Sequence, residues 1–200
     1  AKYQFPGTRA SGAVYSPIHP CRSQKGLIPL NHHLNEFCRT TRELLASEQV
    51  RSMGRWNHHG RITTLDHSLF VAYWSYRAAR KFGWDEAAAA RGGLLHDLYL
   101  YDSKDKSAHP GLQCFDHPRA AARNAAELTA LSDKERNIIL SHMWPLGGQL
   151  PRSREAWLVD LVDTFCAALE LARIYHPGRL REQMGVEPLL EKGEPMPAPC

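Results

Sequence analysis

The chain has 200 residues, of which 43% are hydrophobic, and this length suits one globular domain with a sizeable core better than two full domains. Its formal net charge of +4 suits an anionic substrate but falls short of the clustered charge of a dedicated nucleic-acid binder, which argues against a nucleic-acid partner. No segment approaches the roughly 18 uninterrupted apolar residues of a membrane span, and the five scattered cysteines lack a CxxC pair and favour reduced thiols, so we expect a cytoplasmic protein without a membrane partner.

The first segment, residues 1–31, is rich in Gly, Pro and Ser and lacks a helical period, which predicts an irregular N-terminal arm. A helical pattern follows over residues 31–54. The next predicted helix, over 65–82, is preceded by two threonines that offer an N-cap. Its apolar stripe places His67 on the side that faces the core.

A further helix is predicted over residues 86–100, and it carries His96 and Asp97 side by side. The Gly92-Gly93 pair lowers its helix propensity and is best explained by close packing against a neighbouring element. Burying a histidine or an aspartate without a partner costs several kcal/mol. The core must therefore supply a partner for this pair, and a metal ion is the candidate.

After a polar loop, Asp116 is the predicted N-cap of an alanine-rich helix, so that His117 lies at the mouth of this helix. Ser132 opens a capping box for a helix that carries His142. The last long helix, predicted over 154–175, carries two aspartates in its middle.

No strand pattern or repeat is apparent, so the predicted fold class is all-α. We expect a single compact helical bundle over residues 32–176, with a metal site in its core. Residues 177–200 are rich in proline and predict an irregular C-terminal tail.

The histidines and aspartates that face inward or end helices follow a recognisable order along the chain. They are His67, His96, Asp97, His117, His142 and Asp163. This order resembles the pattern of the HD-domain superfamily of metal-dependent phosphohydrolases, over roughly residues 54–171. An adjacent His-Asp pair alone is weak evidence, but here it lies in "GGLLHDLYLYD", between "LDHSLFVA" and "LVDLVDTFCA".

The resemblance extends to the branch of the family that holds two metals. It implies that His67, His96, Asp97 and Asp163 bind one ion and that His117 and His142 bind the other, with Asp97 as the bridge. Such ligands suit two divalent transition-metal ions, chosen from Fe, Mn, Zn and Co. Asp160 lies one turn before Asp163 and is the alternative ligand on that helix.

The sequence also departs from some members of this branch. Many two-metal cyclic-dinucleotide phosphodiesterases of the family have adjacent histidines where this chain has His142-Met143, and the GYP motif of one group is missing. These departures argue against a cyclic dinucleotide as the substrate, and they leave the metal ligands intact.

Basic and polar residues near the expected mouth of the site are candidates for contact with a phosphate. Beside Asp97 and His96 we assign Lys104 and His59 to catalysis, where they would neutralise developing charge. The candidates for substrate binding are Arg61, Lys106, His109, Trp144 and Arg154. For each charged residue an ordinary solvated loop position is the alternative, and for Trp144 it is packing.

The resemblance implies an enzyme that hydrolyses a phosphomonoester or phosphodiester of a small phosphorylated, nucleotide-like substrate. Two alternatives stay open. The same six-ligand pattern holds a di-iron centre in HD-type oxygenases, and a metal-stabilised module could bind a nucleotide without catalysis. A homo-oligomer is compatible with either an enzyme or a module.

Overall fold

The structure, a computed structural model, describes residues 32–59, 62–103, 105, 107, 111–174 and 178–188. The predicted N-terminal arm and most of the predicted tail lie outside these residues. So do four of the predicted catalytic or binding residues, namely Arg61, Lys104, Lys106 and His109.

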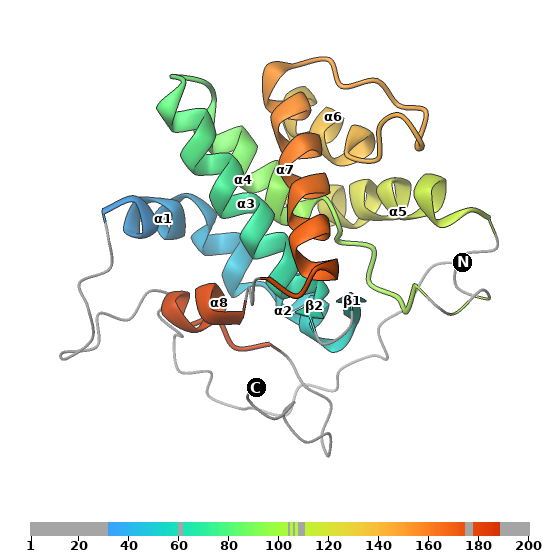
Figure 1. Cartoon of the computed structure of the whole chain (residues 1–200), viewed down its shortest axis with the longest axis horizontal. Helices are drawn as coiled ribbons and strands as arrows, with labels where there is room; N and C mark the ends of the chain where they lie inside the picture. Colours follow the sequence, from blue (N-terminus) through green and yellow to red (C-terminus); the bar gives the residue numbers. More distant parts are fainter. Residues whose placement is uncertain are drawn as a thin grey trace.

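Helices build the described part of the chain, which confirms the all-α fold class (Figure 1). Three of them lie at the centre: α3 (Thr64–Lys81), α4 (Glu86–Leu95) and α7 (Arg154–Leu171). The helices around them are α1 (His32–Ala46), α2 (Glu48–Ser52), α5 (Gln113–Leu128), α6 (Asp133–Ser141) and α8 (Gly178–Met184), with a 3-10 turn η1 at Met53–Arg55.

Helix α3 is buried on nearly every side. Thr63 caps its start, because its side chain accepts a hydrogen bond from the Asp66 backbone N–H. Its buried residues include Leu65, Leu69 and Val71 as well as the predicted ligand His67. The stripe that placed His67 toward the core is thus part of a wider buried surface.

The Gly92-Gly93 pair lets α4 pack closely between two neighbours. A Cβ atom on Gly93 would lie 3.0 Å from the Ala72 Cα atom in α3, and one on Gly92 would lie 2.8 Å from Ile138 Cγ2 in α6. Only glycine fits this spacing without a shift of its neighbours. The close packing expected from the sequence is therefore present, and it fixes the end of α4 deep in the core.

Several boundaries differ from the predicted ones. The first helical stretch breaks at Ser47, whose side chain caps α2. Helix α4 ends at Leu95, so that His96 is its C-cap and Asp97 follows it, rather than both lying within the helix. Helix α5 begins at Gln113, and Asp116 lies in its first turn instead of capping it.

Two short elements were not expected. Strands β1 (Asn57–His59) and β2 (Ile62–Thr63) form an antiparallel hairpin, so the expectation of no strand is wrong for these residues. Helix α8 lies where the sequence suggested an irregular tail. Its Leu180 and Met184 are buried, which explains why so short a helix forms.

Two further expectations concern cysteines and membranes. Cys38 is disulfide-bonded, whereas Cys114 and Cys166 are free, so the expectation of five reduced thiols is wrong for Cys38. Among the described residues, no helix combines the length and the apolar character needed to cross a membrane.

Candidate metal centre

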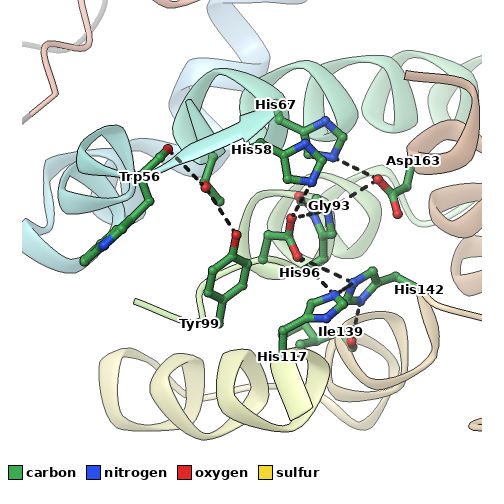
Figure 2. A network of polar contacts seen from close by, with 12 residues as sticks. Trp56, His58, His67, Gly93, His96, Tyr99, His117, Ile139, His142 and Asp163 are labelled. Atoms are coloured by element: carbon green, nitrogen blue, oxygen red, sulfur yellow. Dashed lines mark hydrogen bonds and ion pairs between the residues drawn. The ribbon is translucent and has the colours of Figure 1, made fainter. Parts of the chain in front are cut away.

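Five helices bring the predicted ligands together in the core (Figure 2). His67 comes from α3, and the end of α4 supplies His96 and Asp97. The others lie in α5, at the C-cap of α6 and in α7; they are His117, His142 and Asp163. All six side chains are at most 13% exposed.

Each of the four histidines has an acceptor at its Nδ1 atom. In three of them Nδ1–H donates to a backbone carbonyl one turn earlier: from His96 to Gly93 O at 2.7 Å, from His117 to Gln113 O at 2.6 Å, and from His142 to Ile139 O at 2.8 Å. A carbonyl can only accept, so Nδ1 carries the proton and Nε2 is left with a lone pair. Each of these three rings can therefore offer its Nε2 lone pair to a cation.

When these three rings are neutral, their Nε2 atoms converge without a donor between them. His117 Nε2 lies 2.7 Å from His142 Nε2, and His96 Nε2 is buried with no hydrogen-bond partner in the described part of the chain. Two lone pairs that face each other at this distance repel unless a proton or a cation lies between them. The arrangement therefore fits a cation that accepts several nitrogen ligands at once.

The carboxylate of Asp97 lies between two groups of histidines. Its Oδ1 atom is 3.4 Å from His117 Nε2 and 3.6 Å from His142 Nε2, whereas Oδ2 is 3.7 Å from His96 Nε2. Oδ1 is buried without a hydrogen bond to another described residue. One oxygen for each group is the arrangement expected of a bridging ligand.

Asp163 completes the group around His96 and His67. Its Oδ1 atom is 2.8 Å from His67 Nε2 and 3.6 Å from His96 Nε2. Asp160, the alternative ligand, is buried but contributes no atom to the clusters that could hold a metal among the described residues. Burial and the nearby charge of Asp163 raise the pKa of Asp160 to about 6.

The protonation of the cluster follows from burial and from the carboxylates. Burial lowers the pKa of His117 to about 4, despite the charge of Asp97, so this imidazole is neutral near pH 7. Burial also disfavours a charged His67, but hydrogen bonds and charges from Asp163 and Glu170 outweigh this and raise its pKa to about 10. A metal ion would displace that proton, because a ligating nitrogen must be neutral.

Sequence reasoning missed two residues of the cluster, His58 and Glu170. His67 Nδ1 lies 2.9 Å from Glu170 Oε1, whose side chain is fully buried, and His58 stacks on His67 with 3.9 Å between the ring centroids. The spacing of Asp163 and Glu170, two helical turns apart on one face of α7, was a usable signal for Glu170. Nothing in the helical periodicity marked His58, which lies in the hairpin.

Two of the predicted substrate-binding residues make other contacts. Arg154 stacks on Trp84 at 5.4 Å and faces Glu155, while Trp144 makes an edge contact with Trp157. These contacts agree with the solvated and packing alternatives, and none involves a residue of the cluster. For His59 the structure describes the strand position but not the side chain.

Comparison with known proteins gives one match. Residues 64–168 match the HD domain family, and this range includes all six predicted ligands but neither His58 nor Glu170. Neither the curated proteins nor the solved structures contain a match to the chain. The donor set of imidazole nitrogens and carboxylate oxygens suits a divalent transition metal such as Fe, Mn, Zn or Co.

Proposed function

This chain belongs to the HD domain family, and from that premise we propose that it is a phosphohydrolase with two divalent transition-metal ions and a small phosphorylated, nucleotide-like substrate. Membership of this family implies that the chain belongs to the superfamily of metal-dependent phosphohydrolases. The observation that carries the proposal is the convergence of lone-pair Nε2 atoms on a buried carboxylate, with Nδ1 of each ring held from behind.

The proposed ligands follow the two sides of Asp97. His67, His96, Asp97 and Asp163 would hold the first ion, and His117 and His142 would hold the second, with Asp97 shared. When bound, the ions would supply Lewis-acid polarisation of phosphoryl oxygens and a hydroxide nucleophile near neutral pH. Backbone carbonyls keep the other three rings in one orientation and Glu170 does the same for His67, so little reorganisation is needed when metal binds.

The assignments at the mouth of the site remain part of the proposal. Lys104 and His59 would neutralise charge that develops on the phosphoryl group. Arg61, Lys106 and His109 would bind the phosphate of the substrate. The formal net charge of +4 agrees with an anionic substrate.

The test combines metal analysis with assays. Protein purified without added metal, and after reconstitution with Mn²⁺ or Co²⁺, is measured by elemental mass spectrometry and assayed on phosphomonoesters, phosphodiesters and nucleotides. We expect about two ions per chain in the wild type and in the exposed control Ala87→Ser, about one in His117→Ala, and loss of hydrolysis in Asp97→Asn.

Two results would contradict the proposal. Full metal content and turnover in Asp97→Asn would exclude the bridging role. Iron as the bound metal, with oxygen uptake and no hydrolysis of any phosphate ester, would exclude the proposed hydrolase and favour the HD-type oxygenase.

A further inference from the structure

His58 repeats the environment of the predicted ligand His67. Nδ1 of both rings faces the same carboxylate: Glu170 Oε1 is 2.9 Å from His67, and Glu170 Oε2 is 3.4 Å from His58. Nε2 of both rings faces a predicted metal-binding carboxylate, Asp163 for His67 at 2.8 Å and Asp97 Oδ2 for His58 at 3.4 Å. The two rings are stacked with 24° between their planes (Figure 2).

The backbone of the hairpin explains why His58 points inward. Asn57 pairs with Thr63 and His59 pairs with Ile62, so His58 is the extra residue of a β-bulge. A bulge re-aims a side chain that would otherwise follow the alternation of the strand. The His58 side chain is 18% exposed, so it belongs to the cluster and lies on the side nearest to solvent.

Glu170 does more than neutralise His67. Its side chain is fully buried, and such a carboxylate needs partners on both oxygens. Each oxygen faces the Nδ1 atom of one imidazole, Oε1 that of His67 and Oε2 that of His58. Glu170 therefore holds the two rings side by side with both Nε2 atoms directed at the carboxylates of the centre.

We propose that His58 is a further metal ligand of this centre, binding through Nε2 on the Asp97 Oδ2 side, and that Glu170 is the residue that positions His58 and His67 together. Ligand atoms of His58, His67 and Asp97 all lie within 4.8 Å of one another, as they do in the group of His67, His96 and Asp163. Both added residues lie outside the HD domain match at residues 64–168. The inference rests on the proposed metal centre but not on the reaction that it performs.

The experiment is a Co²⁺ titration of metal-free protein, followed by calorimetry and by the visible absorption of the bound ion, which reports its coordination. His58→Phe keeps a ring stacked on His67 but removes the ligand nitrogen, and His58→Ala removes both. His33→Ala removes an exposed histidine on α1 and serves as the matched control. Circular dichroism of each metal-free variant checks that it folds.

We expect both His58 variants to bind Co²⁺ about tenfold or more weakly than the wild type, with a changed absorption spectrum, because the ion loses one nitrogen ligand. Glu170→Gln should weaken binding at least as much, because it loosens two rings, and His33→Ala should match the wild type. Equal affinity and an equal spectrum in wild type and His58→Phe would overturn the inference.

The outcomes separate this inference from the proposed function. Co²⁺ binding that depends on His58, in a protein that hydrolyses no phosphate ester, would leave the inference standing and remove the function. Hydrolysis by a centre that is indifferent to His58 would do the reverse. A wild type that binds no Co²⁺ would overturn both.

Discussion

The four predicted histidine ligands differ in what holds their Nδ1 atoms. Three rings donate to backbone carbonyls, which are neutral, whereas His67 faces the buried carboxylate of Glu170. A carboxylate makes the imidazole more basic and favours its charged form. His67 is therefore the ring at which a metal ion would compete most strongly with a proton. This difference has a measurable consequence for the metal-free protein.

Without metal, the stability of the protein should fall as pH rises from about 6.5 to 9. The pKa of His67 is raised to about 10 in the folded state, against about 6.5 in an unfolded chain. The protonated ring therefore stabilises the fold fully below pH 6.5, and this stabilisation is lost as pH rises toward the folded-state pKa. Thermal melts of chelator-treated protein across this range measure the effect.

Two comparisons isolate the contribution of His67 to this slope. His67→Gln should flatten the pH dependence of the metal-free protein, even though its stability is lower throughout. Metal-loaded wild type should lose the dependence as well, because the ion takes the place of the proton. A slope that is the same in wild type and His67→Gln would show that other groups cause it.

At the scale of elements, the close approach of α3 and α4 decides where the His-Asp pair lies. Gly93 contacts the backbone of α3 at Ala72, and its carbonyl accepts the hydrogen bond from His96 Nδ1. The same residue thus sets both the helix spacing and the orientation of a predicted ligand. A side chain at Gly93 would push on backbone atoms, which yield less readily than the end of a flexible side chain.

Gly93→Ala should therefore destabilise the protein by about 1–3 kcal/mol, the range for overpacking of a well-packed core. Chemical denaturation of the metal-free variant measures this without the contribution of metal binding. Ala87→Ser, exposed on the same helix, should change stability by less than about 0.5 kcal/mol. Alanine also gains about 1 kcal/mol of helix propensity over glycine, so a Gly93→Ala variant as stable as the wild type would limit the packing cost to about that gain, and a more stable variant would contradict the close approach of α3 and α4.

The sequence predicted the long helices because their signals are local. The Thr63 cap and the Ser132 capping box are both present, the second with its reciprocal hydrogen bond from the Ser132 backbone N–H to the Glu135 carboxylate. The hairpin and α8 escaped prediction because each is too short to show a period and is stabilised by contacts with distant residues.

The candidate site, like the fold, was predictable only where its residues lie on long helices with a visible period. Histidines on apolar helix faces show in the periodicity, so His67 and the His96-Asp97 pair could be found. His58 depends on a bulge in a strand of three residues, and Glu170 on a partner 103 residues away, His67. The position of His58 is not visible until the chain is folded, whereas Glu170 had one signal in the sequence, its spacing of two helical turns from Asp163.

For the whole molecule, the cluster is a junction between helices that are far apart in the sequence. Elements α3, α4, α5, α6 and α7 each place or adjoin at least one of its side chains, and the hairpin adds His58. Without an ion, and with neutral rings, the repulsion between the converging lone pairs opposes this packing. A bound ion reverses the sign of that contribution, so the fold and the proposed centre should be thermodynamically linked.

Metal removal should accordingly lower the melting temperature at pH 7.5. An ion present at about 100 times its dissociation constant stabilises the folded state by about 2.7 kcal/mol. At about 2–4 °C per kcal/mol for a chain of this size, chelation should lower the melting temperature by roughly 5–10 °C. Differential scanning calorimetry before chelation, after it and after Mn²⁺ is restored measures the loss and its recovery. His117→Ala should show a smaller loss, because one proposed ion is already missing, and a melting temperature indifferent to chelation in metal-loaded wild type would argue that the cluster is held by protons instead of by metal.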